Sequence, residues 1–211
     1  MRLPHIGLLL ITLLIMSCKS QAQLTDTHEN EMTAMTELPY TSIPDHAENY
    51  TAAGVAARMV DGLGFRYRWA TEGLTEKDLE YKPDSTARTS MATMDHLLGL
   101  STTIMNAVLK KPNVRPSAET NYTWEEKRRK TLENIKMTSD ILWKSSDEDL
   151  ESYKIIFQRG ENVSEYPFWN NLNGPIADAL WHCGQIVSFR RASGNPIDSR
   201  VSVFSGKLRK R

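Results

Sequence analysis

An apolar stripe with helical period over residues 91–110 constrains the fold more than any other feature of this sequence. Its members recur at spacings of three and four residues, which places them on one face of an α-helix. They are Met91, Met94, Leu97, Leu98, Ile104, Met105 and Val108. Thr89 or Ser90 can cap the start of this helix, and Pro112 follows its end. A helix with such an apolar face must bury it against other elements.

Two further helices are predicted from the signals at their ends. Ser42 and Pro44 suit the cap and the first turn of a helix that continues to about residue 72. Thr123 and Glu126 have the spacing of a capping box, which opens another helix that continues to about residue 143. Between this helix and the last one, residues 153–157 are predicted to form a short strand or an extended crossover.

The last helix is predicted to start at Pro175, with Asn173 or Gly174 as its cap, and to end before Gly194. The sequence thus contains four helical segments of about 20 residues each and no alternating strand pattern along the chain. This combination predicts an all-α fold, specifically a four-helix bundle. The end of the chain after Pro196 is expected to be irregular.

The N-terminus indicates export and lipidation. Arg2 precedes a nearly unbroken apolar run over residues 6–16, which is too short to span a bilayer as a permanent helix. The end of this run resembles a bacterial lipobox, because an aliphatic residue lies three positions before Cys18 and a small residue lies directly before it. The resemblance implies cleavage before Cys18 and a lipid on its sulfur. A plain signal peptide cut after Ala22 or Gln23, or an uncleaved anchor, is the alternative.

These features divide the chain into four parts: a lipoprotein signal peptide (1–17), a polar tether after Cys18 (18–38), the helical domain (39–198) and a basic tail (199–211). Lys19 is not the acidic residue that retains such lipoproteins in the inner membrane of enteric bacteria. We therefore expect a bacterial cell envelope protein, anchored by lipid at the outer membrane or the periplasmic face. With Cys18 lipidated, Cys183 would be the only other cysteine, so no intramolecular disulfide could form.

The balance of charged residues indicates whether nucleic acid is an expected partner. The chain has 26 basic and 26 acidic residues, so no excess positive field favours nucleic acid, and no nucleic-acid partner is expected.

The last helix is apolar on one side and has a buried-looking polar line on another, which suggests that both sides are packed and hints at a homodimer. The sequence does not identify the small-molecule substrate.

Asp178 and His182 lie four residues apart in the last helix and therefore side by side on one face. Gln185 and Phe189 continue the same line, whereas Cys183 points in another direction. An unpaired carboxylate on a packed helix costs several kcal/mol, so Asp178 needs a partner. Two arrangements supply one: a metal cation shared with His182, or an ion pair between these two side chains.

Residues on the second and last helices resemble the DinB-like superfamily of four-helix bundles, which includes damage-inducible and thiol-transferase proteins. The similarity covers about residues 39–197. It rests on Met94-Asp95-His96-Leu97-Leu98-Gly99, on Asp178, His182 and Gly184-Gln185, and on Phe189-Arg190-Arg191 and Gly194-Asn195-Pro196. Members typically place one histidine on the second helix and two, four residues apart, on the last helix, around a divalent metal.

The resemblance implies a divalent-metal site at His96, Asp178 and His182. Asp178 stands where a histidine is usual, so the ligands would be two imidazoles and one carboxylate. Such a set suits zinc first, and nickel, iron or manganese also fit it. Gln185 would orient a ligand or a bound water, and Cys183 is expected to be a small core residue.

Two classes of function follow from this resemblance. A bound metal would lower the pKa of a water or thiol, which implies a metal-dependent hydrolase or a thiol S-transferase. The alternative is a non-catalytic metal-binding, ligand-binding or stress-associated envelope protein. The sequence identifies no catalytic residue beyond the metal ligands.

The lipobox interpretation predicts the fate of radiolabelled palmitate in cells that express the chain. The wild-type chain should incorporate the label, and Cys18→Ala should lose it completely, because the thiol that accepts the lipid is gone. Gel autoradiography of the immunoprecipitated chain measures the incorporation, with Cys183→Ala as the matched control that keeps the label. Equal labelling of wild type and Cys18→Ala would contradict lipidation at this residue.

Overall fold

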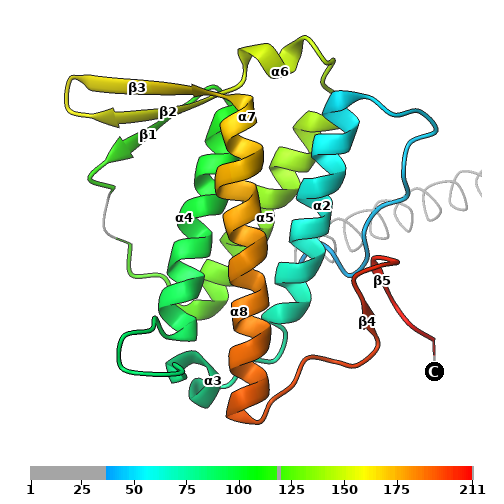
Figure 1. Ribbon diagram of the computed structural model, residues 1–211, viewed down its shortest axis with the longest axis vertical. Helices are drawn as coiled ribbons and strands as arrows, with labels where there is room; N and C mark the ends of the chain where they lie inside the picture. The colour runs from blue at the N-terminus through cyan, green and yellow to red at the C-terminus, as the bar shows by residue number, and fades with distance from the viewer. Residues whose placement is uncertain (1–36, 118–119, 211) are drawn as a thin grey trace, which may run out of the picture. The chain divides into compact units, whose positions relative to one another are not determined.

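The computed structural model describes residues 37–117 and 120–210. Its largest elements are four long helices that lie side by side (Figure 1). These are α2 (Ala52–Ala70), α4 (Ser90–Val108), α5 (Trp124–Leu142) and α8 (Ala177–Ser193). α5 packs against α2 and α4, and α8 packs against the same two helices from another side. Their facing sides bury the core, whose largest members include Tyr67, Phe65, Leu63, Met94, Leu97, Ile104, Leu132, Ile135 and Ile186.

Shorter elements connect and flank the long helices. The helical ones are α3 (Glu76–Glu80), α6 (Asp149–Ser152), α7 (Phe168–Asn171) and a π-helical turn, η1 (Leu172–Ile176). A three-stranded sheet contains β1 (Pro112–Arg115), β2 (Lys154–Arg159) and β3 (Asn162–Pro167), with β2 in the middle. β2 runs parallel to β1 and antiparallel to β3. β4 (Val201–Ser202) and β5 (Lys207–Leu208) form an antiparallel pair near the C-terminus.

The expectation of an all-α chain was therefore incomplete: the structure is mainly helical but also contains these two small sheets. β2 includes residues 154–157 of the segment 153–157 for which a strand or crossover was predicted. β1 and β3 had no strand signal because most of their side chains are exposed, so they show no apolar alternation. Asn113 of β1 accepts a hydrogen bond from Asn106 of α4 (3.0 Å) and donates one to the carbonyl of Ile156 in β2 (3.0 Å), which ties the sheet to the helix.

Two of the predicted helix starts are confirmed by their caps. The Thr89 hydroxyl accepts a hydrogen bond from the amide of Ala92 at the start of α4 (3.1 Å). At the start of α5, Thr123 and Glu126 form the reciprocal capping box. The predicted start of the first helix was wrong, because α2 begins at Ala52 after its cap, Thr51, and not near Ser42.

The segment before α2 is held against the helices instead of joining one. The Tyr40 hydroxyl donates to Oδ1 of the buried Asp61 (3.1 Å), and burial raises the pKa of this phenol well above its usual value. The Tyr40 ring lies against Gly64, where an added Cβ would come within 2.3 Å of it. Further along, the Ile43 amide donates to the carbonyl of Gly206 (2.8 Å). These contacts hold the segment against the helices in an irregular path, so the helical signals at Ser42 and Pro44 have no effect.

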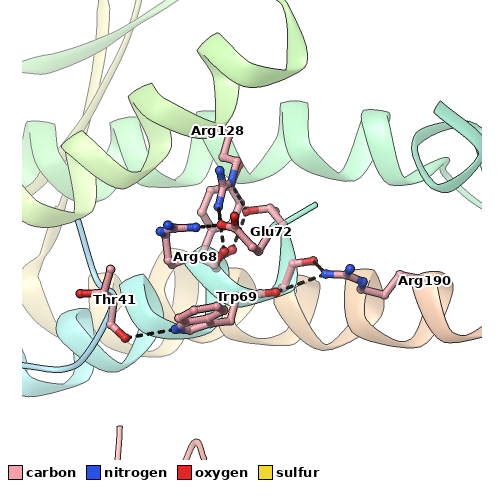
Figure 2. A network of polar contacts seen from close by, with 9 residues as sticks. Thr41, Arg68, Trp69, Glu72, Arg128 and Arg190 are labelled. Atoms are coloured by element: carbon pink, nitrogen blue, oxygen red, sulfur yellow. Dashed lines mark hydrogen bonds and ion pairs between the residues drawn. The ribbon is translucent and has the colours of Figure 1, made fainter. Parts of the chain in front are cut away.

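Two buried arginines from neighbouring helices close the C-terminal end of α2 (Figure 2). Arg128 of α5 donates from Nη2 to the carbonyl of Arg68 (3.1 Å). Arg190 of α8 donates from Nη1 to the carbonyl of Ala70 (3.0 Å). The last carbonyls of a helix have no partner within it and carry partial negative charge, so cationic donors are favourable there. The two arginines therefore link α5 and α8 to the same end of α2.

A buried carboxylate makes the corresponding link between α3 and the end of α8. Oδ2 of Asp78 accepts hydrogen bonds from Nδ2 of Asn195 (2.7 Å) and from the amide and hydroxyl of Thr75 (both 2.8 Å), and Oδ1 accepts one from Ser193. Burial by itself raises the pKa of Asp78, but the hydrogen bonds from Asn195, Ser193 and Thr75 outweigh it and lower the pKa to about 2. The ionised form of Asp78 therefore stabilises the folded chain.

This pKa predicts how stability changes in acid. The pKa of Asp78 is lower in the folded chain than the value of about 3.9 for an unfolded one. Its contribution is therefore complete above about pH 4 and is lost as the pH falls toward 2. Asp78→Asn should cost about 1–2 kcal/mol of unfolding free energy at pH 7 and should reduce the loss of stability between pH 4 and pH 2.

Urea titrations followed by circular dichroism at pH 7, 4 and 2 measure both effects. Asp45→Asn is the control, because the Asp45 side chain is 96% exposed and lies 3.7 Å from its cationic partner, Lys207. This control should leave the stability unchanged within error. A variant at Asp78 with wild-type stability at all three pH values would contradict the stabilising role of this carboxylate.

Candidate metal centre

A π-helical turn sets the orientation of the helix that contains Asp178 and His182. Helical structure is continuous from α7 through η1 into α8, so Pro175, which was predicted to start this helix, lies inside it. Proline has no amide hydrogen, and π turns arise where the regular α-helical bonding is interrupted. The wide turn inserts one additional residue and rotates the rest of the helix by about 100° relative to α7.

The burial pattern shows the effect of this rotation. The buried positions in α7, η1 and α8 are Phe168, Asn171, Ile176, Ala179, Cys183, Ile186, Arg190 and Ser193. Their spacing is three or four residues, except for a step of five across η1. In an uninterrupted α-helix the same buried line would pass through positions 175, 178 and 182. The π turn instead moves Asp178 and His182 from the core line to the adjacent face.

On that face both side chains meet His96 of α4. Nε2 of His96 lies 3.1 Å from Oδ2 of Asp178, and Nε2 of His182 lies 3.2 Å from Oδ1 of the same carboxylate. The two imidazole rings have centroids 4.6 Å apart and stand nearly perpendicular to each other. The structure therefore brings together, from two helices, the three residues that the sequence singled out.

Gln185 also lies at this site, where its Oε1 is 2.6 Å from Nδ1 of His182. Because an amide oxygen can only accept, this contact places a hydrogen on Nδ1. A neutral His182 then has a lone pair on Nε2, which faces an oxygen of Asp178. Two acceptors this close repel each other, so this arrangement calls for positive charge between them. Both arrangements considered for Asp178 and His182 meet this requirement.

The donor set fits a divalent metal ion. One ligand atom each from His96, Asp178 and His182 lie within 4.8 Å of one another, and they are the only such group of histidine, cysteine and acidic residues in the described part of the chain. Ligands of a tetrahedral zinc ion lie roughly 3.4 Å apart, close to the two separations between imidazole and carboxylate. The side chains of His96 and Asp178 are 33% and 37% exposed, and that of His182 is 12% exposed. Such partial exposure leaves room for a further ligand, as in catalytic sites.

The other residues considered from the sequence lie elsewhere. Cys183 is buried, and burial raises the pKa of its thiol to about 12, which agrees with the prediction of a core residue. His46 is exposed, and its ring contacts the carbonyl of Ala47. Cys18 and the apolar run at residues 6–16 lie outside the described residues. In the described part of the chain, no helix combines the length and the apolar character that crossing a membrane requires.

Comparison with known proteins supports the fold assignment. The described domain has a DinB-like fold. Its structure is similar to the crystal structure of a DinB-like protein, YjoA, from Bacillus subtilis, with a TM-score of 0.50 over 71% of this chain and 99% of that chain. The two sequences are 15% identical, so the similarity concerns the fold. No family model matches the sequence, and no curated protein does.

The geometry predicts that metal binding depends on His182. His182→Ala should bind less than about one tenth of the zinc bound by the wild type, because it removes one of three ligands. Gln185→Leu keeps all three ligands but loses the contact that orients His182, so its zinc affinity should fall about tenfold or more. Elemental analysis of chains purified without chelator measures occupancy, and competition with a chelating dye measures affinity.

His46→Ala is the matched control, since it removes an exposed histidine outside the site and should bind metal as the wild type does. Added zinc should also raise the melting temperature of the wild type and of His46→Ala, because a ligand that binds only the folded chain stabilises it. The site would be contradicted by a wild type that is purified without metal and has the same melting temperature as His182→Ala. Its melting temperature would also have to stay unchanged on addition of zinc, nickel, iron or manganese.

Proposed function

We propose that this chain is a DinB-like, divalent-metal-binding lipoprotein of the bacterial cell envelope, and that its metal centre catalyses hydrolysis or thiol S-transfer. The observation that carries the proposal is the convergence of His96, Asp178 and His182 from two helices. The similarity in fold to a DinB-like protein supports the family assignment. The lipobox at Cys18 supports the envelope location.

Each residue of the centre has a distinct task in this proposal. His96 and His182 would bind the ion through Nε2, and Asp178 would bind it through carboxylate oxygen. Zinc is the first choice for such a set, with nickel, iron or manganese as alternatives. A divalent ion bound there supplies Lewis acidity, which lowers the pKa of a coordinated water or thiol. Gln185 holds the ring of His182 in position, and the exposure of His96 and Asp178 gives a small molecule access.

The proposed anchor would place this activity outside the cytoplasm. The polar tether at residues 18–38 would connect the lipid on Cys18 to the helical domain, at the outer membrane or the periplasmic face. The substrate would then be a small molecule of the envelope or the surroundings. The homodimer suggested by the last helix stays a prediction.

One observation favours a second candidate, a non-catalytic metal-binding or ligand-binding envelope protein. Among the described residues, Gln185 is the only side chain outside the set itself that makes a hydrogen bond to His96, Asp178 or His182. An amide neither takes up nor releases a proton at neutral pH. General acid–base catalysis at this site would thus depend on the substrate or on the ligands themselves.

A substrate screen distinguishes these candidates. The zinc-loaded wild type should turn over at least one member of a panel of esters, amides and thiol–electrophile pairs. Removing the metal with a chelator, or replacing His182 with alanine, should lower kcat/KM roughly a hundredfold or more, because Lewis-acid stabilisation contributes several kcal/mol. Asp178→His keeps three ligands and should retain metal. A fully metal-loaded chain that is inactive across the panel would favour the non-catalytic candidate.

A further inference from the structure

A recess lies away from the candidate metal ligands, where the start of α2 meets α6, α7 and η1. Its volume is about 780 Å³, and none of His96, Asp178 and His182 lines it. We call it the α2–α7 groove. Most small-molecule sites in proteins have volumes of about 300–1,000 Å³, whereas protein partners use flatter and larger surfaces. The size of the groove therefore favours a small ligand.

The floor of the groove is apolar. It consists of Val55, Ala56 and Met59 from α2, with Phe168 and Leu172 from the other wall. Val55 is 48% exposed and Met59 is 38% exposed, although both lie on a long helix that buries its other faces. Single exposed apolar side chains are ordinary, but a concave group of them is typical of a binding site. The floor thus fits the apolar body of a ligand.

Two aromatic rings line the same recess and are open to solvent. Tyr50, just before α2, is 96% exposed, and Trp169 of α7 is 76% exposed. Rings of this kind attract cations over their faces, and tryptophan does so most strongly. The faces of these rings also pack against apolar groups. The aromatic pair favours a ligand that is apolar, cationic or both.

Two carboxylates decide the charge of the ligand. Asp147 and Glu151 line the groove, and neither forms an ion pair with lysine or arginine in the described part of the chain. Oδ1 of Asp147 accepts a hydrogen bond from the amide of Ala53 (3.0 Å), which fixes this carboxylate beside the start of α2. No lysine, arginine or histidine lines the groove. The charged side chains that line the groove are therefore both negative, which favours a cation over an anion.

We propose that the α2–α7 groove binds a small cationic amphiphile. The apolar body of this ligand lies on Val55, Met59 and Leu172, and its ammonium group lies between Trp169 and the carboxylates of Asp147 and Glu151. The proposal is independent of the metal centre, because the two sites share no residue.

Isothermal titration calorimetry with octyltrimethylammonium tests the proposal. The full chain is held in phosphatidylcholine nanodiscs, and the titration into empty nanodiscs is subtracted. We expect saturable 1:1 binding that is at least about fivefold tighter than binding of octyl sulfate, which has the same tail and the opposite charge. Glu151→Gln and Trp169→Ala should each weaken binding of the cation roughly two- to fivefold.

Two control variants match these changes outside the groove. Trp181→Ala removes a tryptophan of similar exposure (72%), and Glu161→Gln neutralises an exposed glutamate in the turn between β2 and β3. Both should bind octyltrimethylammonium as the wild type does, and circular dichroism should show that all four variants are folded. Equal affinity for the cation and the sulfate would overturn the proposal, as would wild-type affinity in the Trp169→Ala, Glu151→Gln double variant. Binding of a basic amphipathic peptide without binding of the small cation would assign the groove to a protein partner instead.

Discussion

The packing of α2, α5 and α8 depends on the two arginines that cap the end of α2 (Figure 2). Burial lowers the pKa of both Arg128 and Arg190, since it disfavours the charged guanidinium, yet neither can be replaced by an apolar side chain without leaving helix carbonyls unpaired. Arg190 lies two turns beyond His182 on α8. Its hydrogen bonds to α2 therefore fix both the height and the rotation of the helix that provides two of the three candidate ligands.

At the other end of α8, the π turn sets which face those ligands occupy. Because of the step of five residues between Asn171 and Ile176, the apolar residues that follow the π turn face the core. Asp178 and His182 therefore lie on the adjacent face, beside α4. Trp169 precedes the π turn and lines the α2–α7 groove, whereas Asp178 follows it. A single continuous helix thus contributes to both the candidate metal centre and the α2–α7 groove, because the π turn changes which residues lie on each of its faces.

Local signals predicted those parts of the fold that local interactions decide. The caps at Thr89 and Thr123 are bonded within one turn of their own helices, so their sequence spacing sufficed. The start of α2 was mispredicted because Tyr40, through Asp61, ties the preceding segment to residues far along the chain. The spacing of Asp178 and His182 predicted their contact, whereas the role of His96 came only from the family resemblance. The groove had no local signal, since its walls come from three separate segments.

The carboxylate is the part of the centre that most affects its chemistry. The usual pattern of the family that this chain resembles has three imidazoles, which are neutral ligands and leave both charges of a divalent ion uncompensated. Asp178 would neutralise one of these charges, so it favours binding of the cation in a partly buried site and leaves the ion a weaker electrophile. Asp178 in place of a histidine would thus exchange Lewis acidity of the bound ion for affinity.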